Sequence, residues 1–432
     1  MPATAAHPLT PLDRPAPMKA SVPSGVLMRL LEAAGARPTE AQLAAYREYA
    51  KMGDPLVDDL VTAMGKLPKG LGRKQFEDAL AHGIEAIEDP LPELVALIKD
   101  AERTPFWVDF KKIRRAQRAL RNSPMRLTFA SGIAVTLPVS FLSDGGGNQL
   151  MVRAGGLDRA TPARVVESTA WMHTCAQPDA MDRFGEGFKA TLRVRLIHGY
   201  VRDGARRMGG WDDDAWDFPA SQHQTAAGWV PILAGALTSA AFGVLASPRD
   251  FQAVLHLWRY QSHLLGVRPE LQMDSLAEIG KLAYLMILTD YGTDEYTNQM
   301  THATLDACTD AYGLPKSGPL AAPIQYVVRR FHAEIAGLAF TRARKQVGLP
   351  APSPLLLAVP VIAAATLARS AVRMVVPGAQ ARFEQRQRRI IAEAVARTRS
   401  DLQYNREGIK LSKTPEIRTA GNKPTLAVAE VS

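Results

Sequence analysis

The spacing of apolar residues is the feature of this chain that most limits its fold. The apolar runs repeat at three- and four-residue intervals, and no run alternates convincingly with period two. Alanine is abundant and aromatic residues make up only 7% of the chain, a composition that favours helices over sheets. The sequence therefore predicts an all-α protein.

Capping residues and helix breakers divide the chain into predicted helices. Ser247 with Pro248, and Ser275 with Glu278 three residues later, are typical helix starts, and Gly266 is a typical stop. A further helix is predicted to begin at 161–162. The other expected helical segments are 41–46, 56–64, 75–87, 106–115, 192–208, 226–245, 250–265, 275–288, 294–312, 324–347 and 382–399.

Two neighbouring segments fit this pattern poorly. Residues 129–142 are apolar but are interrupted by Gly132 and Pro138, so they are too short for a clean membrane span. Residues 143–148 contain three consecutive glycines without the strand–turn–helix context of a nucleotide-binding loop. We expect a mobile loop at 143–148 and a channel wall or lid over a pocket in this region.

The length of 432 residues allows one large domain or two to three smaller ones. Cys175 and Cys308 cannot form a disulfide framework, and no cysteine pair suggests a zinc site. The N-terminus lacks the apolar core of a secretory signal, so an intracellular location, cytoplasmic or peripheral to a membrane, is expected. The expected divisions are a disordered leader over 1–38, a helical domain over 39–350 (N-terminal helices 39–125, core 126–350), C-terminal helices over 351–409 and a loose tail over 410–432.

The C-terminal region combines an apolar segment with a basic one. Residues 355–368 are apolar apart from an interruption at Pro360, and Arg369 is expected to close the segment. Between Arg369 and Arg418 there are twelve Lys or Arg and five Asp or Glu. A basic segment suits nucleic acid or an anionic membrane, and the preceding apolar residues favour the membrane. We expect no nucleic-acid partner and a peripheral membrane contact through 355–399, with 355–368 being either a core helix or an interfacial one.

The segment 192–208 carries one histidine between two arginines at helical spacing. Arg195 lies three residues before His198 and Arg202 four residues after it, so all three share one helix face. Gly199 removes a side chain beside the histidine and would let a flat ligand approach. These features suit a haem-binding helix, with an axial nitrogen and cations for the propionates. They also suit a core histidine on a basic helix whose arginines pair with acidic residues elsewhere.

Several classes of site are absent from the sequence. It contains no GxSxG nucleophile elbow, no HExxH zinc motif and no phosphate-binding P-loop. No histidine has a glutamate three residues before it, which disfavours a di-iron carboxylate bundle. His256, His263 and His332 are the alternatives to His198 as a metal ligand, although each also suits a core or helix-surface position.

A second helix, the one predicted from 161, carries a polar group at helical spacing. Arg164, Glu167 and Ser168 share a face. A charged pair near an apolar face requires either a partner or a function. An ion pair on a helix surface is the alternative explanation.

At this point the residues resemble a known family. Residues 193–202 are similar to the signature of the latex-clearing proteins (rubber oxygenases) and of the membrane-bound oxygenase of mycophenolic acid biosynthesis. The resemblance covers roughly Gly53 to Val347. It also includes the segments 76–84, 106–109, 255–260, 264–271 and 275–278.

The resemblance implies an all-α fold with a globin-like helical core that holds one haem b, with additional N- and C-terminal helices. It implies His198 as the proximal iron ligand, and a distal group that here reads Arg164, Glu167 and Ser168. Rubber-cleaving members have a distal lysine where this chain has Glu167, and a threonine where it has Ser168. Gly199 replaces the usual alanine. These departures leave haem binding in place and count against polyisoprene cleavage.

Three functions follow from these residues, in order of preference. The first is a haem-b-dependent oxygenase that uses O2 on an apolar, unsaturated substrate of isoprenoid or lipid-like chemistry, small or polymeric, with Arg195 and Arg202 toward the propionates and no second protein ligand on iron. The second is a haem-binding gas sensor or carrier without turnover. The third is a helical protein that has lost haem. A visible spectrum and O2 uptake distinguish them.

Overall fold

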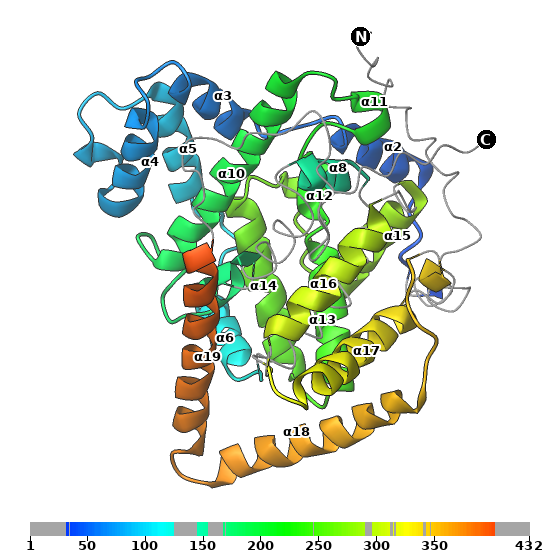
Figure 1. Cartoon of the computed structure of the whole chain (residues 1–432). Helices are drawn as coiled ribbons and strands as arrows, with labels where there is room; N and C mark the ends of the chain where they lie inside the picture. The colour runs from blue at the N-terminus through cyan, green and yellow to red at the C-terminus, as the bar shows by residue number, and fades with distance from the viewer. Residues whose placement is uncertain are drawn as a thin grey trace, which may run out of the picture.

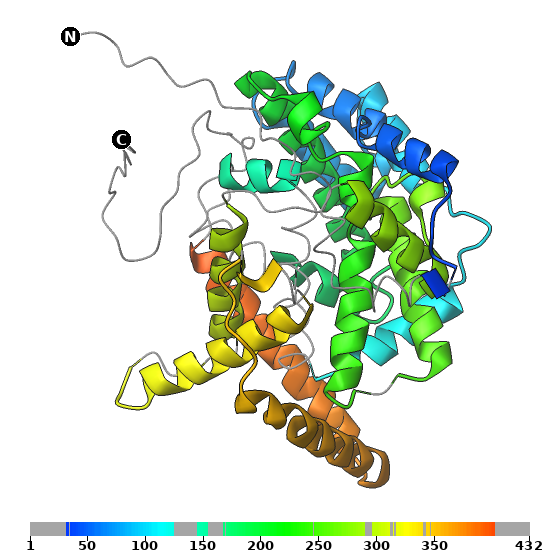
Figure 2. The same ribbon diagram turned by 90° about the vertical axis from the view of Figure 1, so that its right-hand side faces the viewer.

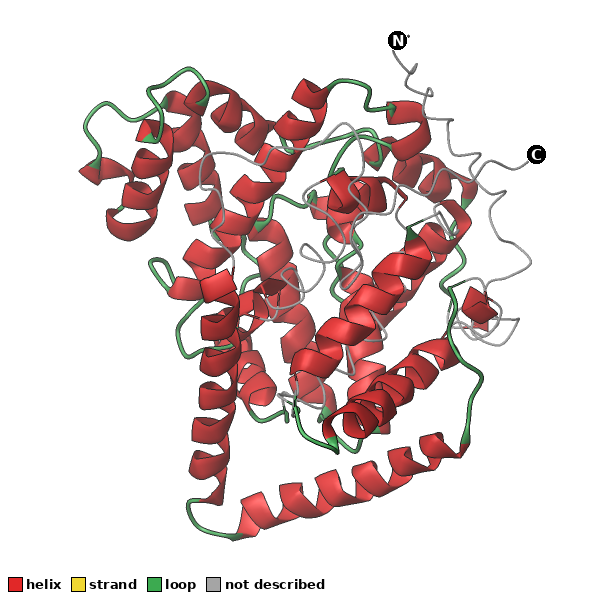
Figure 3. Cartoon of the chain, in the orientation of Figure 1, coloured by secondary structure: helices red, strands yellow, loops and turns green. Residues whose placement is uncertain are grey.

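The computed structural model is helical throughout the part of the chain that it describes, and no strand occurs in that part (Figure 3). The prediction of an all-α fold is confirmed. The predicted segment 129–142 and the tail 410–432 lie outside the described residues. The residues described are 32–33, 35–124, 145–153, 167–168, 170–244, 246–289, 296–311, 314, 317–339, 343–345 and 347–401.

The helices fall into three groups along the chain (Figure 1). The first group is α2 (Glu40–Tyr49), α3 (Pro55–Met64), α4 (Leu71–His82), η1 (Ile84–Ala86), α5 (Pro92–Glu102) and α6 (Phe110–Arg121). The second is α8 (Gly145–Arg153), α10 (Glu186–Met208), α11 (Asp213–Trp216), α12 (Gln222–Ala226), α13 (Trp229–Ala241), α14 (Pro248–Leu264) and η2 (Pro269–Leu271). The third is α15 (Leu276–Thr289), α16 (Thr297–Ala311), α17 (Ala321–Ala339), η3 (Ala343–Lys345), η4 (Pro354–Leu357), α18 (Ala358–Val375) and α19 (Ala379–Asp401).

Helices α10 and α14 lie at the centre and separate two apolar clusters (Figure 1). The first cluster joins buried side chains of α3, α4, α5, α6, α10 and α14, including Phe188 and Leu196 of α10. The second joins α2, α13, α14 and α15, and Val194 of α10 packs against it. Because Leu196 and Val194 point to different clusters, the two sides of α10 have different surroundings.

The predicted helix boundaries around α14 and α15 are confirmed in detail. The Ser247 hydroxyl accepts a hydrogen bond from Asp250 N at 3.1 Å, and Pro248 is the first helical residue. Gly266 ends the segment in a left-handed conformation with φ +79°. Ser275 Oγ accepts from Glu278 N at 3.3 Å, although the Glu278 carboxylate returns to Asp274 N at 2.9 Å, one residue earlier than a capping box requires.

The expected loop over 143–148 is wrong for residues 145–148, which begin α8. A β-carbon on Gly146 would collide with the Trp216 carbonyl and would lie 2.6 Å from Gln224 Nε2. Gly146 therefore serves close packing of α8 against α11 and α12, and this tertiary contact outweighs the poor helix propensity of glycine.

The apolar C-terminal segment also differs from its prediction. Helix α18 continues through Pro360 and beyond Arg369, ending at Val375. Pro360 is the third residue of the helix, where its missing N–H removes no hydrogen bond within the helix. The segment is therefore a full helix and not a short apolar run.

Candidate functional site

Arg195 is a buried residue of α10. It forms ion pairs with one carboxylate at the start of α3 and one carboxylate in α5. Its side chain is 3% exposed. Nε donates to Asp54 Oδ2 at 2.6 Å, Nη2 donates to Asp54 Oδ1 at 3.1 Å, and Nη1 donates to Asp100 Oδ2 at 3.0 Å. Burial opposes the charge of Arg195, but the two carboxylates outweigh this effect and raise its pKa. The guanidinium thus fixes α10 to the start of α3 and to α5.

Arg202 has a similar anchor but keeps one free donor. Nε donates to Asp58 Oδ1 at 2.5 Å and Nη1 donates to the Ala220 carbonyl at 3.0 Å. Nη2 is buried and has no hydrogen-bond partner among the described residues. Burial raises the pKa of Asp58, and the charge of Arg202 opposes this shift. An unpaired N–H group in a buried guanidinium is costly, so this atom is suited to an anionic ligand.

A backbone junction encloses the Arg195 ion pair. The Gln222 amide nitrogen donates to the carbonyls of Gly53 and Gly266, at 3.0 Å each, and its oxygen accepts from Arg268 N at 2.9 Å. A β-carbon on Gly266 would collide with the Asp54 carboxylate and lie 2.6 Å from Arg195 Nε. Glycine is therefore required here both for φ and for the close approach of the chain to the ion pair.

His198 is half-buried on the side of α10 that carries Val194. Since the two residues are one helical turn apart and Val194 packs against the second apolar cluster, the histidine faces the same side. Gly199 faces α3: a β-carbon there would lie 3.0 Å from Val61 Cγ2 and 3.2 Å from Val57 Cγ2. The expectation that Gly199 admits a ligand is wrong, because its space is used by α3.

Three tryptophans lie at the second apolar cluster, against which Val194 of α10 also packs. Trp171 Nε1 donates to Thr191 Oγ1 of α10 at 3.0 Å. The Trp258 ring lies 5.6 Å from the Trp171 ring and 6.2 Å from the Trp229 ring. The indole N–H groups of Trp229 and Trp258 are buried and have no partner in the part of the chain that the structure describes. Large aromatic surfaces with unused donors are typical of a ligand pocket.

The predicted distal group is only partly described. Arg164 lies outside the described residues. Glu167 and Ser168 are helical, the first half-buried and the second exposed. Glu167 is one turn before Trp171, so it shares the face that contacts α10. The placement of all three residues in one pocket stays a prediction.

The alternative histidine ligands have other environments. His256 Nε2 accepts the backbone N–H of Asp109 at 2.8 Å, and its ring meets Trp107 edge-on at 5.6 Å. His263 stacks on Tyr260 at 6.4 Å, and His332 is buried with Nδ1 2.8 Å from the Val328 carbonyl. Burial lowers the pKa of all three. His256 is the most clearly structural of them, since its Nε2 lone pair is already used.

Within the described residues no group of three His, Cys, Asp or Glu side chains could hold a metal ion. A single histidine therefore suits iron only when a macrocycle supplies the remaining ligands. The Cys175 thiol is no alternative ligand, because burial raises its pKa to about 12.

Sequence reasoning missed the carboxylates that hold the site together. Asp54, Asp58 and Asp100 pair with α10 across 95 to 144 residues of sequence. In the sequence, Gly53, Asp54 and Pro55 are typical helix-breaking residues and by themselves indicate no ion pair. Asp54, together with two arginines at helical spacing on an apolar helix, was the signal that could have suggested the pairing.

The arrangement of helices has a counterpart among solved structures. The structure titled "Structure of Latex Clearing Protein LCP in the closed state" superposes with a TM-score of 0.57 at 16% sequence identity, covering 80% of this chain and 89% of that chain. At this identity the likeness concerns the fold. No curated protein sequence matches the chain. Residues 145–373, more than half of the chain, match the family described as "ER-bound oxygenase mpaB/B'/Rubber oxygenase, catalytic domain", and the chain therefore belongs to this family of oxygenases.

Proposed function

We propose that this oxygenase binds one haem b through His198 and uses O2 to oxidise an apolar, unsaturated substrate of isoprenoid or lipid-like chemistry. The observation that carries the proposal is the position of His198: half-buried, on the tryptophan-lined side of a helix that three carboxylates fix in place. A rigid helix of this kind holds a ligating imidazole at a constant distance and orientation.

The residues present fit the requirements of a haem. An axial imidazole is supplied by His198, and the unpaired Arg202 Nη2 offers a buried donor for a propionate. Arg195 was expected to serve the propionates as well, but each of its three guanidinium nitrogens donates to Asp54 or Asp100. We assign Arg195 the role of positioning α10 and keep Arg202 as the propionate partner.

When bound, the haem supplies the activation of O2, which protein side chains cannot provide. The chain's own residues control the surroundings. The indoles of Trp171, Trp229 and Trp258 exclude water and give the substrate an apolar wall. Glu167, half-buried on the face that continues to Trp171, can hold or release a proton at its carboxyl group.

Haem content tests the ligand assignment. His198→Ala is expected to abolish stoichiometric haem, measured as the pyridine haemochrome, while far-ultraviolet circular dichroism stays unchanged. His256→Ala is the matched control, because its Nε2 serves Asp109 N, and it should keep its haem. Full haem with an unchanged Soret band in His198→Ala would overturn the assignment.

The role of Arg202 requires a control for its ion pair. Arg202→Leu should weaken haem retention, whereas Arg207→Leu should not, because Arg207 pairs with Asp203 on the exposed side of the same helix. Asp58→Asn breaks the Arg202 ion pair and keeps the guanidinium. Equal haem loss in Asp58→Asn and Arg202→Leu would show that only the ion pair matters.

Oxygen uptake with unsaturated isoprenoids and lipids tests the reaction. We expect uptake by the haem-loaded protein, and Glu167→Gln should retain haem and CO binding while turnover slows by about a hundredfold or more. Spectral changes with O2 and CO, without product from any unsaturated substrate, would contradict the proposed oxidation and would favour a gas sensor or carrier.

A further inference from the structure

Helix α18 exposes an apolar surface that a water-soluble helix would bury. Together with η4 it forms the one segment among the described residues, Pro354–Val375, that is long and apolar enough to cross a membrane. Its most apolar 18-residue window has a mean hydropathy of 2.0, yet only 6% of the residues in that window are buried. Leu357, Val361 and Val375 are 71%, 68% and 77% exposed. Such a contiguous apolar face is typical of a contact with another apolar phase.

Helix α18 differs from a typical surface helix in where its side chains lie. Thr366 is its buried residue, and Arg373 donates to the Asn122 carbonyl of the body at 3.1 Å. The outer side is apolar at helical spacing over Leu357, Val361, Leu367, Val372 and Val375. The apolar residues therefore face away from the protein.

Both ends of α18 are fixed to the body. Before the helix, Ser353 N and Oγ donate to the buried Glu334 carboxylate at 2.9 and 3.0 Å. After it, Gln380 Nε2 donates to Asn122 Oδ1 at 2.5 Å. Figures 1 and 2 both show α18 along one edge of the molecule, outside all other helices. Since both ends return to the same body, α18 cannot cross a bilayer without detaching from it, and it would lie in the interface plane.

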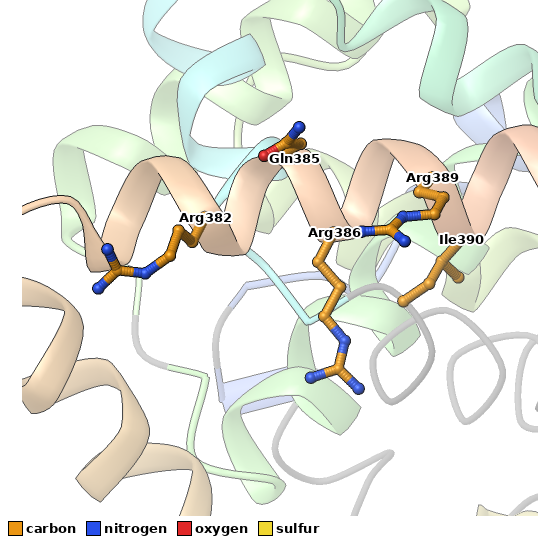
Figure 4. Close-up of a pocket in the computed structure, with 5 residues that line it drawn as sticks. All are labelled: Arg382, Gln385, Arg386, Arg389 and Ile390. Atoms are coloured by element: carbon orange, nitrogen blue, oxygen red, sulfur yellow. The ribbon is translucent and has the colours of Figure 1, made fainter.

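The next helix, which follows α18 directly, carries several cations. Arg382, Arg386 and Arg389 of α19 line a recess of about 450 Å³ together with Gln385 and Ile390 (Figure 4). No carboxylate of the described residues pairs with these three arginines; the neighbouring Arg388 is 3.8 Å from Glu384. From Arg369 to Arg399 the chain has eight arginines and two glutamates. Arginine recognises phosphate through two parallel hydrogen bonds.

We infer that α18 and the first turns of α19 form a docking surface for the anionic face of a lipid bilayer. The outer side chains of α18 enter the acyl boundary, and Arg382, Arg386 and Arg389 bind lipid phosphates around it. The charge of α19 selects this occupant over a second copy of the chain, because two copies would bring like-charged helices together. The surface acts without haem, so this inference is independent of the proposed function.

Flotation of the purified full chain with vesicles tests the surface. We expect binding to vesicles of phosphatidylcholine mixed with phosphatidylglycerol, weaker binding to phosphatidylcholine alone, and a decrease with added salt. Val361→Asp should abolish binding to both kinds of vesicle. Arg382→Gln should lower partitioning into the anionic vesicles about fivefold, and Arg382→Gln with Arg386→Gln about twenty-fivefold.

The controls change the same chemistry elsewhere on the surface. Leu276→Asp replaces an apolar side chain that is 46% exposed, and Arg249→Gln removes an exposed arginine; neither should alter partitioning. Circular dichroism and gel filtration check the fold of each variant. Failure of the wild-type protein to float with anionic vesicles would overturn the inference. The inference would also be overturned if the wild-type protein did not bind lipid but formed a concentration-dependent dimer, and if Val361→Asp dissociated that dimer.

Discussion

Helices α10 and α19 both carry several arginines, but these arginines differ in burial and in their acidic partners. In α10, Arg195 and Arg202 are buried and face carboxylates of α3 and α5. In α19, Arg382, Arg386 and Arg389 border an open recess and have no acidic partner among the described residues. Arginines satisfied within the chain hold helices in place, whereas unsatisfied ones on the surface are available to an external anion.

The largest expected effect comes from removing a buried carboxylate that pairs with α10. Asp54→Ala leaves Arg195 buried with only Asp100 opposite, and the free energy of unfolding should fall by about 3–5 kcal/mol. Urea denaturation measures it. Asp203→Ala, which breaks the exposed pair with Arg207 on the same helix, should change it by less than about 1 kcal/mol. Comparable losses in the two variants would remove the distinction between buried and surface arginines.

The glycine that faces the same ion pair gives the second effect. Gly266→Ala adds a β-carbon against Asp54 and Arg195 at a φ of +79°, and should lower the free energy of unfolding by about 2–3 kcal/mol. Gly235→Ala in α13 is the control, because a β-carbon there meets nothing within 4 Å. Alanine in a helix interior should stabilise by up to about 1 kcal/mol. A stable Gly266→Ala protein would show that the junction can widen.

An intermediate effect is expected where α19 approaches the body. Burial, and then the charges of Arg121 and Arg388, lower the pKa of His173 from 6.5 to about 4. In the unfolded state His173 is protonated near pH 6.5, whereas in the folded state it stays neutral down to about pH 4. Stability should therefore fall as pH drops through this window, by about 1–2 kcal/mol after allowing for partial exposure.

Thermal or urea unfolding across that pH range gives the measurement, with His173→Gln as the comparison. The variant should lose less stability than the wild-type protein between pH 6.5 and 4, and the difference should stop growing below that window. Parallel pH profiles for the two proteins would exclude His173 as the responsible group. The other buried histidines contribute equally to both profiles, so they cancel.

The smallest effect is expected within α19 itself. Glu384→Gln breaks an ion pair of 3.8 Å whose arginine is 55% exposed, and should change the free energy of unfolding by less than about 0.5 kcal/mol. Vesicle binding should increase slightly, because the local positive charge grows. A loss of stability as large as that of Asp54→Ala would contradict the contrast between the two helices.

Capping residues and helix-stopping glycines predicted the ends of the helices well. Ser247 and Gly266 define the ends of the α14 segment in the structure as they do in the sequence. Residues 145–148 were misassigned because glycine has a low helix propensity, whereas Gly146 is placed by its contact with Trp216. Pro360 and Arg369 suggested a short segment, but their positions on α18 leave its hydrogen bonding intact.

In the candidate site, too, local features could be predicted from the sequence and long-range contacts could not. His198 and its flanking arginines could be selected from their spacing alone, since helical periodicity is local. Their partners could not, because Asp54 and Asp100 lie 141 and 95 residues from Arg195. The orientation of Gly199 toward α3 likewise depends on which helix lies beside α10, and periodicity does not contain that information.

The carboxylates of Asp54, Asp58 and Asp100 limit where the chain can be truncated for expression. All three precede residue 145, where the match to the oxygenase catalytic domain begins. A fragment trimmed to that match would keep Arg195 and Arg202 in its central helix and lose every acidic group that neutralises them. Expression boundaries for this chain therefore belong before Asp54.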